Sequence, residues 1–255
     1  MKVVILAGGL GTRISEESHL RPKPMVEIGG KPILWHIMKS YSTHGLTDFV
    51  ILCGYKGHII KDYFTNYLLY NADVSVDLGT GEFNILNHDA EPWRITMLNT
   101  GELTQTGGRL GYARPHLTEP FCLTYGDGVS DVDVTSLIDF HFAEGRQATV
   151  TAVQPTGRYG SIEMDGNAAS GFVEKPAGDH SWVSGGFFVC EPSVLDHIEG
   201  PETIWEKEPL QRLVRGGQLS VYQHRGFWSA MDTLRDKTYL EGLWSGGEAP
   251  WKTWT

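Results

Sequence analysis

The sequence lacks the features that would place this chain in a membrane, in an oxidising compartment or on nucleic acid. No apolar run approaches the roughly 20 residues of a membrane-spanning helix. There are only 3 cysteines among 255 residues. Cys53, Cys122 and Cys190 each lie in an apolar run, which is typical of reduced thiols in a protein core. The formal net charge of −10 argues against nucleic acid as a partner. Because the chain begins with an apolar segment of strand length and not with a signal peptide, we expect a cytoplasmic protein.

The motifs of several common enzyme classes are also missing. The 10 histidines show neither an H-E-x-x-H run nor paired Cys and His spacings, which argues against a zinc site. There is no G-x-S-x-G nucleophile elbow and no G-x-x-x-x-G-K-[ST] phosphate loop. A dinucleotide fingerprint begins at Gly9 but fails at Ile14, where its last glycine should stand. This failure disfavours a nicotinamide-dependent oxidoreductase.

What is present is a glycine-rich turn directly after a strand. Residues 3–7 are all apolar, which is typical of a strand buried on both faces in a parallel sheet. The run GGLG at 8–11 follows, and it lets a ligand lie against bare backbone N–H groups. Arg13 and Lys23 add two cations, so the segment suits a polyphosphate. An idle turn with two surface cations is the alternative, but this loop is long for a mere connection.

The charge distribution points to a metal as well as an anion. Residues 71–140 contain 3 arginines and 11 acids. An acidic protein that binds a polyphosphate needs a locally basic loop and usually a divalent metal. Asp127 follows the apolar run 121–124 and is flanked by glycines, so it is placed to hold a cation at a strand end, although Asp-Gly is also common in turns. Asp232 precedes a helical segment and could be an N-cap, a ligand or both.

The alternation of segments predicts the fold class. Helix-like patterns at 32–41 and 58–70 enclose a strand-like run at 48–53, which predicts a doubly wound, mostly parallel (mixed) Rossmann-like sheet flanked by helices. Ligands in such sheets bind at the carboxyl ends of the strands. We expect one domain over residues 1–255, with a β-rich insertion near 71–104, and a C-terminal helix and tryptophan-rich tail from about 233.

Three further segments are candidates for ligand contact. The polar turn from Thr104 to Gly108 precedes a helix expected from about 109 to 116, and Arg109 stands at its start, where an anion or a base edge could bind. An ordinary loop-to-helix junction remains an equal alternative. Gly160 begins one strand-like segment, and Gly185 with Gly186 interrupts another. Glycine within a strand marks close approach by a ligand or by another backbone.

These pieces occur in the order found in sugar-1-phosphate nucleotidylyltransferases, which the chain resembles along its whole length. The resemblance rests on G-G-x-G-T-R at 8–13, P-K-P at 22–24, G-D-G at 126–128, E-K-P at 174–176 and M-D at 231–232. The segments 22–39 and 231–237 are similar to the members that use CTP and glucose 1-phosphate. The implied reaction gives CDP-glucose and pyrophosphate, with Mg²⁺, for bacterial surface polysaccharide such as lipopolysaccharide O-antigen.

The resemblance also implies roles for individual residues. Catalysis by neutralisation of charge is implied for Arg13, Lys23 and Lys175. Nucleotide binding is implied for Leu6, Ala7, Gly8, Gly9, Leu10, Gly11, Thr12, Arg13, Lys23, Thr104, Gly108, Arg109 and Asp127. Sugar-phosphate binding is implied for Tyr125, Gly160, Glu174, Lys175, Gly185 and Gly186. Mg²⁺ would be held by Asp127 and Asp232.

Two other functions stay open on the sequence. The same reaction with UTP or dTTP would use the same phosphate-binding residues and differ only in the base pocket. A regulatory subunit that binds nucleotide or sugar phosphate without turnover is disfavoured, because Arg13, Lys23, Asp127, Lys175 and Asp232 are all present. The resemblance further implies a homo-oligomer, with no membrane or nucleic-acid partner.

Overall fold

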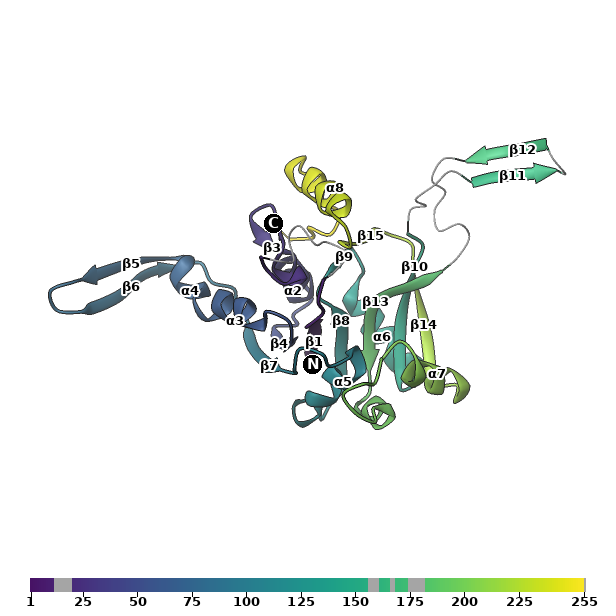
Figure 1. The fold of residues 1–255 in the computed structure, drawn as a ribbon, viewed down its shortest axis with the longest axis horizontal. Helices are drawn as coiled ribbons and strands as arrows, with labels where there is room; N and C mark the ends of the chain where they lie inside the picture. Colours follow the sequence, from purple (N-terminus) through teal and green to yellow (C-terminus); the bar gives the residue numbers. More distant parts are fainter. Residues whose placement is uncertain (12–19, 156–160, 166–167, 174–181, 255) are drawn as a thin grey trace.

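The computed structural model describes residues 1–11, 20–155, 161–165, 168–173 and 182–254. Its centre is a seven-stranded sheet in the order β14-β10-β13-β8-β1-β4-β7 (Figure 1). The strands are β1 (Lys2–Ala7), β4 (Asp48–Cys53), β7 (Arg94–Asn99), β8 (Phe121–Tyr125), β10 (Ala148–Val153), β13 (Val183–Cys190) and β14 (Leu219–His224). β1 pairs in parallel with β4 and β8, whereas β13 is antiparallel to both of its neighbours. The predicted mixed, mostly parallel sheet is confirmed.

Helices cover both faces of this sheet. They are α2 (Ile33–Thr43), α3 (Gly57–Thr65), α4 (Tyr67–Tyr70), α5 (Thr106–Tyr112), α6 (Val134–Glu144), α7 (Glu208–Arg215) and α8 (Leu234–Ser245), with short 3₁₀ helices η2 (Lys23–Met25), η3 (Arg114–His116) and η5 (Pro192–His197). None of the helices in the described part of the chain has the length and apolar character needed to cross a membrane.

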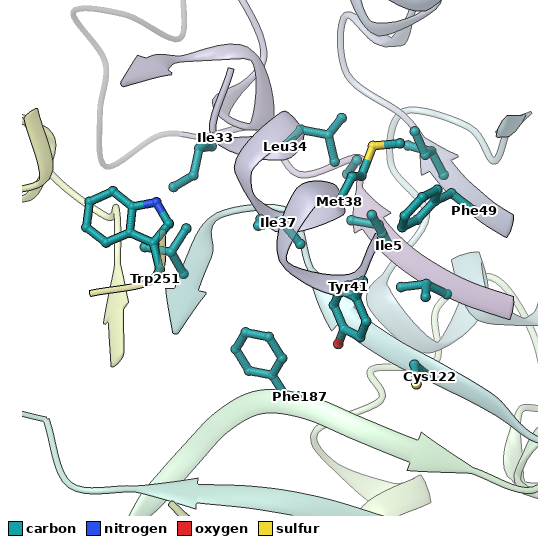
Figure 2. Packing of buried hydrophobic residues seen from close by; sticks show 14 of the residues in the cluster. Ile5, Ile33, Leu34, Ile37, Met38, Tyr41, Phe49, Cys122, Phe187 and Trp251 are labelled. Atoms are coloured by element: carbon teal, nitrogen blue, oxygen red, sulfur yellow. The ribbon is translucent and has the colours of Figure 1, made fainter. Parts of the chain in front are cut away.

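The alternation of side chains along β1 explains its uninterrupted apolar run. Val3 and Ile5 point into one hydrophobic cluster, which contains residues of α2 and α8. Val4 and Leu6 point into a second cluster on the other face, which contains residues of α5 and α7. In Figure 2, Met38 and Tyr41 of α2 lie beside Ile5 of β1, and Ile33 lies toward Trp251. The prediction of a strand buried on both faces is therefore confirmed.

Four two-stranded sheets accompany the central one. They are β2–β3 (Glu27–Ile28 and Lys31–Pro32), β5–β6 (Ala72–Asp77 and Glu82–His88), β9–β15 (Gly128–Ser130 and Trp228–Ala230) and β11–β12 (Ser161–Asp165 and Ala168–Val173). The β5–β6 and β11–β12 hairpins extend away from the body on opposite sides in Figure 1. The segment 94–99 falls within the β-rich insertion expected near 71–104 but belongs to the central sheet, because β7 pairs in parallel with β4.

The helix expected from about 109 to 116 is wrong at both ends. α5 begins at Thr106, because contacts with a distant loop satisfy amides of this first turn: Gln105 N donates to Pro201 O at 2.9 Å and Gly108 N to Thr203 O at 3.0 Å. α5 ends at Tyr112, and the proline in η3 follows shortly afterwards, since proline cannot donate to an α-helical ladder.

The tryptophan-rich tail packs onto the body of the chain. Trp251 is only 1% exposed, and its ring stacks on Phe227 with centroids 5.5 Å apart. Its indole N–H also faces His36 of α2. The tail therefore closes the hydrophobic cluster on the α2 side of the sheet (Figure 2).

Candidate functional site

A cavity of about 320 Å³ opens at the carboxyl ends of β1 and β8. It is lined by Leu6, Ala7, Gly8, Gly9, Gly11, Lys23, Pro24, Thr104, Gln105, Thr106, Arg109, Gly126, Asp127 and Asp232. Most of the predicted nucleotide-binding residues thus meet in one place. The reason is topological, because parallel strands bring the loops at their carboxyl ends to one edge of the sheet.

Lys23 lies at the centre of the charged part of this cavity. Its ammonium nitrogen donates to Asp127 Oδ2 and to Asp232 Oδ1, each at 2.6 Å. The Lys23 side chain is 12% exposed. Burial alone would lower the pKa of Lys23, but the charges and hydrogen bonds of the two carboxylates raise it above its ordinary value. Lys23 is therefore a fixed cation at neutral pH.

Local pairing brings the two carboxylates together from distant parts of the sequence. Asp127 lies in the turn between β8 and β9, and Asp232 follows β15. β9 and β15 pair antiparallel, and Met231 N donates to Asp127 O at 2.8 Å. The helix cap is Thr233 and not Asp232, since Thr233 and Asp236 form a capping box at the start of α8. The Asp232 carboxylate is consequently left to bond Lys23.

This pair of carboxylates fits a hard divalent cation. Both converge on one cationic nitrogen, so their oxygens already face a common point. Among the described residues, no group of three or more His, Cys, Asp or Glu could hold a metal ion. Two carboxylates are nevertheless enough for Mg²⁺ when substrate phosphates complete its coordination.

Arg109 has a different place from the one expected. It lies in the last turn of α5, is 4% exposed and lines the cavity. Its Nη1 donates to Thr100 Oγ1 at 2.7 Å and its Nη2 to Gly8 O at 2.9 Å. Burial lowers the pKa of Arg109. The guanidinium thus ties the glycine-rich loop to the segment after β7, in addition to facing the cavity.

Protein atoms, and not an open space, surround three of the predicted glycines. A Cβ on Gly186 would lie 2.4 Å from Cδ2 of Tyr125, and one on Gly185 would lie 2.8 Å from Cγ1 of Val153. A Cβ on Gly108 would lie 2.3 Å from Pro201 O. These glycines therefore permit close packing of the chain itself. They are not among the residues that line the cavity, and neither are Tyr125 and Leu10.

Some predicted residues lie outside the part of the chain that the structure describes. These are Thr12, Arg13, Gly160, Glu174 and Lys175. Conversely, four residues line the cavity that the sequence did not single out, namely Pro24, Gln105, Thr106 and Gly126. Each is adjacent to, or within, a motif that was recognised, so proximity in sequence was the available signal.

The fold and the site together define a class of nucleotide-transferring enzyme. The model of the family described as "Nucleotidyl transferase" matches residues 2–236, and the chain belongs to this family. It is 54% identical to the glucose-1-phosphate cytidylyltransferase of Salmonella typhi over the full length of both chains. It is 43% identical to the probable glucose-1-phosphate cytidylyltransferase of Bacillus subtilis, again over both full lengths. The solved structure of HddC from Yersinia pseudotuberculosis shares the fold, with a TM-score of 0.70 at 21% identity, covering 95% of this chain and 99% of that one.

Proposed function

We propose that this chain transfers a cytidylyl group from CTP to α-D-glucose 1-phosphate, giving CDP-glucose and pyrophosphate. One observation carries the proposal: Lys23 lies between Asp127 and Asp232 in a cavity beside the glycine-rich loop. Cations and bare N–H groups in a cleft suit two phosphorylated substrates. The relatives that match over their full length support CTP and glucose 1-phosphate as these substrates.

The chemistry requires no general base. The nucleophile is a phosphate oxygen of the sugar phosphate, whose second pKa of about 6 leaves it mostly ionised at neutral pH. What the protein must supply is alignment of two anions for in-line attack and neutralisation of the charge that develops on the leaving pyrophosphate. Lys23 provides a fixed positive charge at the α-phosphate. The loop at 8–11 provides backbone N–H groups, whose dipoles point their positive ends at the phosphates.

The remaining roles follow from charge and position. Nucleotidyl transferases generally use a divalent metal, and we propose Mg²⁺ held by Asp127 and Asp232. When bound, it supplies positive charge to the substrate phosphates. Arg13 neutralises the pyrophosphate, and Lys175 and Glu174 bind the phosphate and hydroxyl groups of the sugar. These last three assignments concern residues outside the described part of the chain.

The deciding experiment is pyrophosphate release from glucose 1-phosphate and Mg²⁺ with CTP, UTP, dTTP, ATP and GTP in parallel. We expect release with CTP at a rate far above that with the other four nucleotides. Release with UTP or dTTP would support the proposed mechanism and reject CTP as the nucleotide substrate. Binding without release for all five would favour a regulatory subunit.

We also propose that the chain forms a homo-oligomer through the β5–β6 hairpin. Val74 pairs with Ile85 and Val76 with Phe83, so the four side chains lie on one face. They are between 38% and 52% exposed. An isolated two-stranded hairpin is marginally stable in water, and a second copy of the chain is always present to cover this face. Trp251 of the tail is buried within its own chain and does not supply this contact.

A further inference from the structure

The loop between η5 and α7, residues 199–207, clamps the start of α5. Gln105 N donates to Pro201 O at 2.9 Å, and Gly108 N donates to Thr203 O at 3.0 Å. This approach is possible only because α5 carries glycine there, since a Cβ on Gly108 would lie 2.3 Å from Pro201 O. The loop is thus fixed against the wall of the cavity that Thr104, Gln105 and Thr106 form.

A buried tryptophan anchors the same loop to the central sheet. Trp205 is 0% exposed, and its ring meets Phe188 of β13 edge to face, with centroids 5.9 Å apart. Its backbone N–H donates to Thr106 Oγ1 at 2.9 Å. The backbone at the next residue, Glu206, is therefore held in place although the Glu206 side chain itself is exposed.

Glu206 joins α5, which lines the cavity through Thr106, to the end of β8, which leads to the cavity residues Gly126 and Asp127. Thr106 Oγ1 donates to Glu206 Oε2 at 2.6 Å, and the hydroxyl of Tyr125 donates to Glu206 Oε1. Tyr125 is the last residue of β8, two positions before Asp127. Burial, followed by the charge of Glu206, raises the pKa of Tyr125, so the phenol keeps the proton that it donates.

We infer that Glu206 is a positioning residue for the nucleotide: it holds the first turn of α5 at a set distance from the end of β8. The distance between Thr104–Thr106 and Asp127, which line the cavity, then stays the same when a nucleotide enters. The inference rests on the proposed function, because it assumes that this cavity binds the nucleotide. Glu206 is exposed and lies outside both hydrophobic clusters, so its loss should spare the fold.

The test compares Glu206→Ala with Glu202→Ala, which removes an exposed acid of the same loop. Steady-state kinetics give kcat and the KM for the nucleotide, and a melting curve gives Tm with and without the nucleotide. We expect Glu206→Ala to raise the KM about tenfold with a smaller change in kcat, because one charged acceptor for two hydroxyls is lost. Glu202→Ala should match the wild type.

A second variant separates positioning from general destabilisation. Tyr125→Phe removes one of the two donors, and it should raise the KM less than Glu206→Ala does. The double variant Glu206→Ala/Tyr125→Phe should be no worse than Glu206→Ala, since both changes break the same contact. Glu206→Gln, which keeps one acceptor oxygen, should recover part of the loss.

Two results would overturn the inference: an unchanged KM in Glu206→Ala, whatever happens to its Tm, or independent, multiplying effects in the double variant. The comparison uses whichever of CTP, UTP, dTTP, ATP and GTP gives the wild type its greatest turnover or rise in Tm. A wrong base would therefore reject the proposed substrate and still test Glu206. A wild type that neither binds nor turns over any of the five would reject both proposals.

Discussion

At the scale of single residues, the charge balance around Lys23 suits the binding of a divalent cation. One ammonium group faces two carboxylates, so the cluster is net negative where phosphates are to bind. The bare N–H groups of the glycine-rich loop and the guanidinium of Arg109, which also line the cavity, add positive character beside this cluster. We propose that a divalent cation held by Asp127 and Asp232 reverses the sign of the cluster itself and so favours a polyphosphate there.

Asp127→Asn and Asp232→Asn should each raise the Mg²⁺ concentration needed for half-maximal pyrophosphate release. At a fixed, low Mg²⁺ concentration the rate should fall about 10²–10³-fold, as for loss of one electrostatic contact to a transition state. Mn²⁺ binding in the presence of CTP, followed by electron paramagnetic resonance, gives a readout independent of turnover. The control is Asp131→Asn, because Asp131 is 31% exposed, close to the 30% of Asp127, but bonds His224 instead. An effect in only one of the two variants would contradict a shared metal site.

The two adjacent glycines of the loop should respond differently to alanine. A Cβ on Gly8 would lie 2.3 Å from Nη1 of Arg109, whereas a Cβ on Gly9 would have nothing within 4 Å. Gly8→Ala must therefore displace a buried guanidinium from its hydrogen bonds, at a cost of about 1–3 kcal/mol in the free energy of unfolding. Gly9→Ala should leave that free energy unchanged. Urea denaturation measures both, and equal values for the two variants would show that Arg109 does not hold the loop.

At the scale of elements, α2 is fixed on one side by the sheet and on another by the C-terminal tail. His36 is fully buried, and its Nε2 lies 2.8 Å from Ile28 O. The indole N–H of Trp251 donates to His36 Nδ1 at 3.4 Å, and the ring of Trp244 meets the imidazole with centroids 4.7 Å apart. This arrangement requires neutral imidazole with its proton on Nε2, because Nδ1 accepts.

The buried His36 should make stability depend on pH between about 4 and 6.5. Burial lowers the pKa of His36 to about 4, against about 6.5 in the unfolded chain. The unfolded state therefore binds more protons in this interval, and stability is present above it and lost as pH falls through it. Between pH 7 and pH 5 the loss should be about 2 kcal/mol.

Urea denaturation at both pH values measures this loss. His36→Gln should remove this part of the pH dependence, whereas His58→Gln, at an exposed histidine of α3, should retain it. An unchanged difference between the two pH values in His36→Gln would assign the effect to other groups.

At the scale of the whole molecule, the β5–β6 hairpin is a part of the chain that extends beyond the body and leaves an apolar face exposed. Its four-residue apolar face consists of Val74, Val76, Phe83 and Ile85, and β5 carries Ser75 on the opposite face. Figure 1 shows the hairpin reaching well beyond the sheet. A face of this kind that stays exposed is an aggregation hazard, which supports the proposal that a second copy of the chain buries it.

The double variant Val76→Asp/Phe83→Asp should convert the oligomer to monomers. Two carboxylates on the apolar face would have to be buried without partners, which costs several kcal/mol. Ser75→Asp places one carboxylate on the other face and should leave the oligomer intact. Sedimentation velocity at several protein concentrations distinguishes the two. A wild type that is monomeric throughout would reject the proposed assembly.

The sequence predicts those features of this protein that depend on residues adjacent along the chain. The apolar run of β1 and the turn at 8–11 depend on neighbours along the chain, and both were foreseen. Asp127 was recognised from the strand before it and the glycines beside it. Glycine within a strand predicts close approach at 185 and 186, but the sequence does not distinguish a ligand from the chain itself. Tyr125 and Val153 are what approaches.

The tertiary structure alone decided which distant residues meet. The convergence of Asp127 and Asp232 on Lys23 depends on pairing between β9 and β15, and the place of Arg109 depends on the two loops that follow β1 and β7. Glu206 had no signal at all, because its partners Thr106 and Tyr125 are far from it in sequence. A sequence determines the chemistry of each segment through its composition and period. The distances between segments are set by the packing of the sheet and its helices, and it is those distances that make a site.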